Sequence, residues 1–224
     1  MRVARTIGVI GLCCGMGFGC AAGRDDTAET YVVRPQDTLY GIAWRHDLDY
    51  RDLARWNNIG TDYRISVGQV LTLRPAGAAP ASAAPRVSAP RPVPSPTVPA
   101  PAAGTAQWVW PTEHASAPRP VPGGGILLLG QLGQPIRAAS SGRVVYVGSG
   151  IRGYGNLIII KHGDNLLSAY AHARELSVRE GDDVSGGQVI AQMGAGAHQI
   201  AALYFEIRRN GKPVDPLPFL PVSR

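Results

Sequence analysis

Residues 203–208 read Leu203-Tyr204-Phe205-Glu206-Ile207-Arg208, and Gly211-Lys212-Pro213-Val214-Asp215-Pro216 follows after a short break. Upstream of them lie short runs rich in β-branched or apolar residues, which favour strands: 144–147, 157–160, 166–170 and 189–191. Turns rich in glycine and asparagine separate these runs. No segment of this region keeps a helical period. The sequence therefore predicts a mainly β domain of two packed sheets.

The runs at 203–208 and 211–216 resemble the end of the LytM, or lysostaphin-like, peptidoglycan endopeptidase domain. In that family the first run reads His-x-His-Phe-Glu-(Ile/Val)-Arg. Upstream, Pro135-Ile136-x-Ala138-Ala139 and Gly142-x-Val144 fix the register of the resemblance. It implies a lysostaphin-like fold with a duplicated hybrid motif over residues 108–224.

Zinc hydrolysis needs three protein ligands and an open position for water. The LytM family takes its ligands from a His-x-x-x-Asp segment and from the second histidine of His-x-His. The resemblance places these positions on Gly123, Leu127 and Tyr204. The neighbouring catalytic histidine falls on Ala202, and only His172 remains, as a remnant of a Tyr-Ala-His motif. We therefore expect no metal, no cofactor and no catalytic residue.

A groove that has lost its metal ligands is free to receive another protein chain. We predict a partner-binding groove lined by side chains that flank the motif positions: Leu127, Tyr154, Tyr170, His172, Tyr204 and Arg208. Aromatic and arginine side chains are favoured anchors of interfaces. An alternative interpretation is that Tyr170 and Tyr204 only fill the space left by the metal. A zinc site rebuilt from His114, His162 or His198 is not favoured, because His162 falls on a turn and His198 would need a loop excursion.

A second module is predicted over residues 28–75. Tyr31-Val32-Val33 begins a strand, Asp37 or Thr38 caps a helix, and Asp49 or Tyr50 begins another helix. A turn at Gly68 leads to a returning strand. This βααβ pattern resembles the LysM family, whose members bind glycans that contain N-acetylglucosamine, chiefly peptidoglycan or chitin.

The LysM resemblance implies a glycan-binding surface formed by two loops. Its predicted residues are Asp37, Thr38, Leu39, Tyr40, Tyr63, Arg64 and Ile65. Three of them also have a structural interpretation, since Asp37 and Thr38 can cap a helix and Ile65 can belong to the core.

Two further segments are predicted to lie outside the folded parts. Residues 76–107 are rich in alanine and proline and cannot bury enough apolar surface to fold, so we expect a disordered linker. Residues 1–20 resemble an export signal of lipoprotein type, with Arg2 and Arg5 before an apolar stretch and Cys20 as the residue to be acylated. Cleavage of an ordinary signal nearby is the alternative. The cysteines all lie within this segment, which excludes disulfides and thiol catalysis in the rest of the chain.

The formal net charge is +6, and loss of Arg2 and Arg5 with the signal leaves +4, a modest positive charge that suits an anionic cell wall or membrane surface. Nucleic acid is not expected as a partner, because no basic run with interleaved aromatic residues occurs. The order of signal, LysM-like module, linker and degenerate LytM-like domain resembles the NlpD/EnvC group of murein hydrolase activators, and NlpD most.

The resemblance to these activators implies a non-catalytic wall protein. It would bind peptidoglycan and activate an N-acetylmuramoyl-L-alanine amidase during cell division. It would sit on the periplasmic face of the outer membrane if lipidated, and in the periplasm otherwise. A structural peptidoglycan-binding lipoprotein is the alternative, and an active zinc endopeptidase is disfavoured by the lost ligands.

Overall fold

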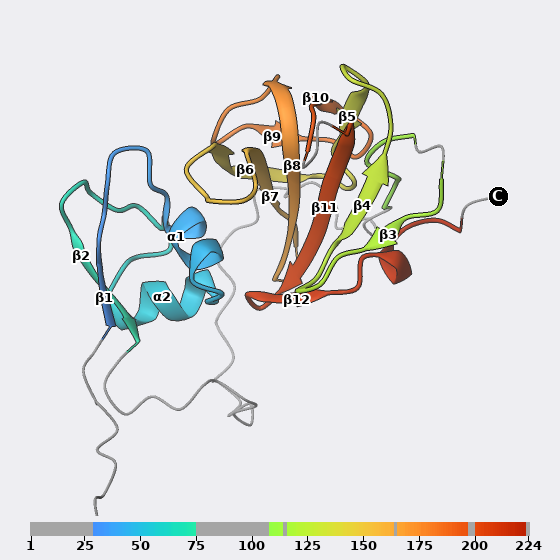
Figure 1. Cartoon of the computed structure of the whole chain (residues 1–224). Coiled ribbons are helices and arrows are strands. Elements are labelled where there is room, and N and C mark those ends of the chain that lie inside the picture. The colour runs from blue at the N-terminus through green and yellow to red at the C-terminus, as the bar shows by residue number, and fades with distance from the viewer. Residues whose placement is uncertain (1–28, 75–107, 114–115, 164, 197–199, 223–224) are drawn as a thin grey trace, which may run out of the picture.

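The computed structural model describes residues 29–74, 108–113, 116–163, 165–196 and 200–222. The predicted signal, with Cys20, and the predicted linker lie outside the described residues. We call the two folded parts the amino-terminal module (residues 29–74) and the carboxy-terminal domain (residues 108–222) (Figure 1).

The amino-terminal module has the predicted βααβ order: β1 (Glu29–Val32), α1 (Leu39–Arg45), α2 (Tyr50–Trp56) and β2 (Val70–Arg74). β1 and β2 pair antiparallel. The Thr38 hydroxyl caps α1 by accepting a hydrogen bond from Gly41 N at 3.0 Å, and Asp49 caps α2 by accepting from Arg51 N at 2.8 Å. These caps satisfy amide groups that have no partner within a helix, which explains why both short helices begin there.

The carboxy-terminal domain is built almost entirely of strands, as the sequence predicts. The described strands are β3 (Arg119–Pro120), β4 (Ile126–Leu129), β5 (Pro135–Arg137), β6 (Gly142–Gly148), β7 (Asn156–Lys161), β8 (Leu166–Leu176), β9 (Asp183–Val184), β10 (Val189–Met193), β11 (Ala202–Arg209) and β12 (Lys212–Val214), followed by the short helix η2 (Leu217–Phe219).

The main layer of this domain has the strand order β3-β4-β11-β8-β7-β6-β9, and β12 pairs with β11. The long strand β8 pairs with β11 through its first half and with β10 through its second half, and β10 pairs with β5. β10 and β5 therefore lie over one face of the main layer. A hydrophobic core fills the space between the layers, with Ile136 and Ile190 on one side and Phe205 and Tyr170 on the other.

Strand β11 shows how the two faces of the main layer differ. Leu203, Phe205 and Ile207 are fully buried in the core between the layers, on what we call the inner face. Because side chains alternate along a strand, Tyr204 and Arg208 point to the opposite, outer face. The strand register places further side chains from β7 and β8 on this outer face, where they pack together in one hydrophobic cluster: Leu157, Ile159, Leu167, Ala169 and Ala171.

The amino-terminal module lies against this outer face. Its buried residues, among them Ile42 and Trp44, form a single hydrophobic cluster with Ile159, Ala169 and Ala171 of the sheet. Figure 1 shows α1 on the side of the module that is turned toward the carboxy-terminal domain. The outer face is therefore buried by a distant part of the same chain.

Candidate functional site

A buried carboxylate organises the outer face at β11. Glu206 is 1% exposed, and three side chains form hydrogen bonds with its two carboxylate oxygens. Arg208 Nε donates to Oε1 at 2.6 Å, and the hydroxyls of Tyr204 and Tyr154 lie 2.7 and 3.3 Å from Oε2. Burial raises the pKa of both tyrosines, and the negative charge of Glu206 adds to the effect. The two hydroxyls therefore stay protonated at neutral pH and can donate to the carboxylate.

Tyr204 also closes the space beside the start of β4. Its hydroxyl lies 2.9 Å from the carbonyl oxygen of Gly124. A Cβ atom at Gly125 would come within 2.8 Å of that hydroxyl, so the backbone of this segment wraps closely around the phenol. The Tyr204 phenol therefore occupies the space between Gly124 and Glu206.

The residues present at the expected zinc positions do not fit a zinc ion. Gly123 has no side chain, Leu127 is apolar, and the Tyr204 phenol is engaged with Gly124 and Glu206. Zinc sites in proteins use thiolate, imidazole or carboxylate ligands. Within the described ranges, no group of three His, Cys, Asp or Glu side chains is placed to hold a metal ion.

Besides Arg208, four of the predicted groove residues lie on the outer face: Leu127, Tyr154, His172 and Tyr204. Leu127 lies beside Tyr204 in the strand register. The rings of Tyr154 and His172 lie 5.6 and 6.3 Å from the ring of Tyr204. Burial lowers the pKa of His172, which favours its neutral form.

Tyr170 corrects the prediction, because its side chain belongs to the inner face. It is fully buried in the core, and its hydroxyl accepts a hydrogen bond from Ala139 N at 2.8 Å. Residues 170 and 172 would share a face in a regular strand. The backbone of His172 has φ 64°, in the left-handed region, and this breaks the alternation and turns the two side chains apart. Tyr170 therefore cannot line the groove.

Arg208 is the point where the amino-terminal module holds the outer face. Its guanidinium lies 3.8 Å from the centre of the Trp44 ring, and Nη1 donates to Trp44 O at 3.0 Å. The same nitrogen forms an ion pair with Asp47 at 3.0 Å. The Arg208 side chain is 5% exposed, so the module covers it almost completely.

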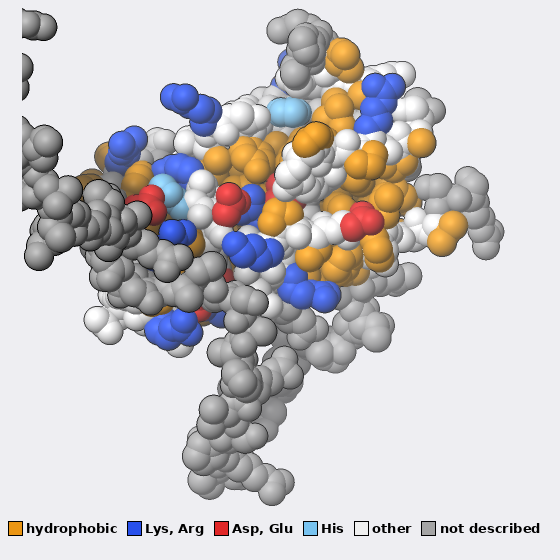
Figure 2. All heavy atoms as spheres, turned by 60° about the horizontal axis from the view of Figure 1, so that its bottom comes forward, with side chains coloured by type: hydrophobic (Ala, Val, Ile, Leu, Met, Phe, Trp, Pro, Cys, Tyr) orange, Lys and Arg blue, Asp and Glu red, His pale blue; other side chains and the backbone are white. Residues whose placement is uncertain are grey.

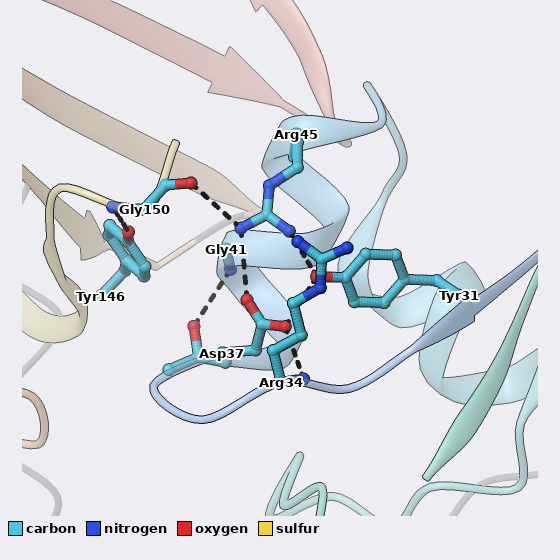
Figure 3. A network of polar contacts seen from close by, with 8 residues as sticks. Tyr31, Arg34, Asp37, Gly41, Arg45, Tyr146 and Gly150 are labelled. Carbon is cyan, nitrogen blue, oxygen red and sulfur yellow. Dashed lines mark hydrogen bonds and ion pairs between the residues drawn. The ribbon is translucent and has the colours of Figure 1, made fainter. Parts of the chain in front are cut away.

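A second contact joins α1 to the loop between β6 and β7 (Figure 3). Arg45 Nη2 donates to Gly150 O at 3.4 Å and forms an ion pair with Asp37 at 3.2 Å. The Tyr146 hydroxyl accepts from Gly150 N at 3.0 Å and so holds this loop in place. Gly41 packs against the Tyr146 ring, where a Cβ atom would come within 2.8 Å.

The structure gives structural roles to several predicted glycan-binding residues. Asp37 accepts hydrogen bonds from Arg34 N at 2.9 Å and from the Tyr31 hydroxyl at 2.7 Å (Figure 3). Thr38 is the helix cap described above. Leu39 is fully buried in the module, so its side chain cannot reach a ligand. This corrects the prediction for Leu39, which has no solvent-exposed surface.

The remaining predicted glycan-binding residues lie around an aromatic cluster. The ring of Tyr40 lies 4.5 Å from that of Tyr50 and 5.6 Å from that of Tyr63. Lys161, from β7, places its ammonium group 5.6 and 5.3 Å from the Tyr50 and Tyr63 rings. Arg64 is exposed, and Ile65 packs against the cluster as its core interpretation predicts.

A hollow on the carboxy-terminal domain is left open by the module. A pocket of about 520 Å³ lies between the start of β4 and the segment after β12, lined by residues that include Gly124, Pro213 and Leu217. Figure 2 looks at the side of the molecule where β12 and β3 lie and shows hydrophobic side chains gathered there with basic ones at the edges. The sequence prediction did not include this pocket.

Sequence reasoning also missed Trp44, Tyr146, Lys161 and Glu206. Each has an ordinary interpretation as a core or surface residue of its own part of the chain. In the segment Phe205-Glu206-Ile207, strand alternation places the carboxylate on the face opposite the core, but only the covering module makes that face a buried one where Glu206 needs partners. No local signal pairs Trp44 with Arg208.

Comparison with known proteins agrees with both parts of the fold. The profile of peptidase family M23 matches residues 122–216, and that of the LysM domain matches residues 31–74. The "Lipoprotein NlpD/LppB homolog" of Pseudomonas aeruginosa is 46% identical over 231 residues, covering 87% of this chain and 78% of the relative.

Two proteins of Escherichia coli are also similar over most of the chain. "Murein hydrolase activator NlpD" is 38% identical over 259 residues, covering 87% of this chain and 68% of the relative. "Uncharacterized lipoprotein YgeR" is 38% identical over 219 residues, covering 91% and 87%. The predicted family resemblance and the predicted fold class are thereby confirmed.

Proposed function

This chain belongs to the NlpD family of lipoproteins and murein hydrolase activators, and from that premise we propose that it activates an N-acetylmuramoyl-L-alanine amidase. The amidase would split septal peptidoglycan during cell division, and this chain would bind the wall without cutting it. It would therefore act in the cell envelope as a binding protein with the fold of a peptidase.

The state of the expected zinc positions carries this proposal. Gly123, Leu127 and Tyr204 stand where the LytM family has ligands, and Tyr204 is tied to Gly124 and Glu206 by its hydroxyl. A metal-activated water needs three protein ligands to hold the ion, and these side chains do not supply them. The Tyr204 hydroxyl forms hydrogen bonds within the chain at the position where the LytM family binds zinc. This supports a binding function in place of hydrolysis.

We propose that the outer face is where the amidase binds. Leu127, Tyr154, His172, Tyr204 and Arg208 belong to it, while Tyr170 is removed from the predicted set. The chemistry of these residues supports the assignment, since two tyrosines and an arginine are typical anchors of protein interfaces.

We propose that residues 28–75 bind peptidoglycan glycan strands, as the LysM profile supports. The ligand would contact Tyr40, Tyr63, Arg64 and Ile65, together with the partly exposed Asp37 and Thr38. Residues 108–224 would then form the activating domain, and residues 76–107 the linker between them.

We further propose that residues 1–20 are an export signal and that Cys20 carries lipid. The names of the relatives, which include lipoproteins, support this. Such an anchor would place the chain at the periplasmic face of the outer membrane. No helix in the part of the chain that the structure describes is long and apolar enough to cross a bilayer.

A dye-release assay on purified peptidoglycan sacculi tests the proposed function. We expect little release by this protein alone, weak release by a candidate amidase alone, and strong release by both together. Release by this protein alone that a zinc chelator abolishes would show it to be an endopeptidase. Binding to sacculi without stimulation of any amidase of the same cell would favour a structural wall protein.

A further inference from the structure

We propose that the amino-terminal module is a removable cover of the outer face, and that glycan binding to the module helps to remove it. This regulation rests on the proposed function, because it concerns the face at which the amidase would bind. It predicts a closed form, which is the arrangement described above, and an open form in which the two parts are separated.

The first support comes from what the module covers. Ile159, Ala169 and Ala171 are fully buried although they point away from the core of their own domain. Arg208 directs its guanidinium onto Trp44 and Asp47 of the module. A partner that used Arg208 or Tyr154 as an anchor would have to displace the module first.

The second support comes from what the sheet covers on the module. Lys161 lies over the rings of Tyr50 and Tyr63, and Tyr63 is a predicted glycan-binding residue. Arg45 shares its guanidinium between Asp37, at the base of the other glycan-binding loop, and Gly150 of the carboxy-terminal domain. The closed form therefore engages both predicted glycan-binding loops or their direct neighbours.

The third support is the nature of the contact itself. Two of its closest points are glycines, Gly41 on the module and Gly211 in the turn between β11 and β12. A Cβ atom at Gly211 would come within 2.5 Å of the backbone of Leu48 and Asp49. Protein interiors tolerate little overlap of this kind, so a single added atom is enough to disturb the fit.

The closed form covers residues that both proposed ligands would contact, so the binding of one ligand affects the binding of the other. A ligand that binds only the open form shifts the population toward that form. Linkage then requires that glycan binding strengthens amidase binding and that amidase binding strengthens glycan binding by the same factor. The protein would thus be held closed away from peptidoglycan and opened where glycan strands are abundant.

The test uses Gly211→Asn in the full chain. Gly211 has φ 74°, a conformation that asparagine tolerates better than other side chains, but the added side chain would meet the module. Gly187→Asn is the matched control, because Gly187 has φ 81° and nothing lies within 4 Å of its added Cβ. Gly41→Ala is a second substitution designed to push the two parts apart, at a helical position that alanine favours. We call Gly211→Asn and Gly41→Ala the wedge variants.

Two measurements are made on each variant, with its thermal unfolding transition recorded as a check of folding. Small-angle X-ray scattering gives the radius of gyration, with and without soluble uncrosslinked glycan strands from digested sacculi. The dye-release assay gives the amidase concentration dependence of stimulation. We expect both wedges to enlarge the radius of gyration and to stimulate more strongly than wild type and Gly187→Asn.

Glycan strands should enlarge the wild type and change the wedge variants little. If the closed form makes up about nine-tenths of the wild-type population, opening strengthens apparent amidase binding about tenfold. Equal radii and equal stimulation in wild type and in both folded wedge variants would overturn the proposal. Opening by glycan and by the wedges without stimulation of any amidase would support the cover and overturn the proposed function.

Discussion

The two faces of β11 are buried in different ways. Leu203, Phe205 and Ile207 are buried by the strands of their own domain, so they leave water when that domain folds. Glu206 and Arg208 are equally buried, but the atoms that cover Arg208 belong to the amino-terminal module. Burial on the inner face is therefore a property of the domain, whereas burial on the outer face depends on the placement of a second folded part.

The tyrosines of the two faces repeat this contrast. The Tyr170 hydroxyl bonds to Ala139 N and lies 2.9 Å from Ser168 Oγ, inside the core. The Tyr204 hydroxyl reaches Gly124 and Glu206 at the border of the covered face. One phenol stabilises the fold, and the other shapes a surface that a partner can use once it is uncovered.

The largest effect is expected for Phe205→Ala on the inner face. The change leaves a cavity beside Tyr170, whose ring lies 5.3 Å away, and should cost about 3–5 kcal/mol of the free energy of unfolding. Urea unfolding of the full chain measures it. A loss below about 1 kcal/mol would contradict the assignment of this face to the domain core.

Arg208→Ala should have the next largest effect, and on the outer face. It removes a charge-assisted contact to Trp44 O, of the class that contributes about 1.5–3 kcal/mol, together with the ion pairs to Asp47 and Glu206, and should separate the two parts. The radius of gyration should increase while the core of the domain stays folded. Arg209→Ala is the control, since the neighbouring Arg209 is exposed and lies over Phe219. An equal response of both variants would contradict the role given to Arg208.

A paired comparison of Tyr170→Phe and Tyr204→Phe should show a smaller difference. The first leaves the buried amide of Ala139 without its acceptor and should cost about 1–3 kcal/mol. The second removes the hydroxyl of a partly buried ring. Glu206 keeps Arg208 and Tyr154 as donors, so the cost should be about 0.5–1.5 kcal/mol, with a further change in amidase stimulation. Differential scanning calorimetry gives the order, and a reversed order would place Tyr204 in the structural core.

The smallest effect concerns pH and His162. This side chain is 5% exposed, its Nδ1 donates to Ser141 O at 2.7 Å, and burial lowers its pKa below the ordinary value of 6.5. Its contribution to stability is present above that ordinary value and is lost as the pH falls through the lowered pKa. We expect the free energy of unfolding to fall as the pH drops below the ordinary pKa of 6.5.

His162→Gln should make this pH dependence weaker. His172→Gln should change it less, because His172 is only half-buried. Chemical denaturation across the pH range gives both slopes. The same slope in wild type and in His162→Gln would assign the pH dependence to other groups.

Much of the fold followed from local patterns. Thr38 and Asp49 predicted where the two helices begin, and the apolar runs predicted strands β6, β7, β8 and β10. Such signals lie within a few residues of each other, so no knowledge of distant contacts is needed. The loss of zinc ligands at Gly123, Leu127 and Tyr204 could likewise be inferred once the register of the resemblance was fixed.

The rest depends on backbone detail and on distant contacts. Tyr170 was placed on the wrong face because the left-handed conformation of His172 interrupts the strand alternation, and histidine carries no strong signal for it. The cover could not be predicted, because Trp44 has the pattern of a helix core residue and Arg208 that of an exposed strand residue. Only their juxtaposition across the two parts reveals the contact.

The pairing of Glu29 with Arg74 across β1 and β2 has a mechanical consequence. The chain enters and leaves the amino-terminal module at neighbouring points of one antiparallel ladder. A pulling force on the two flanking segments would therefore load the hydrogen bonds of this ladder one after another, from its open end. Tension along the chain would thus separate β1 from β2 step by step, beginning at the Glu29–Arg74 end of the ladder.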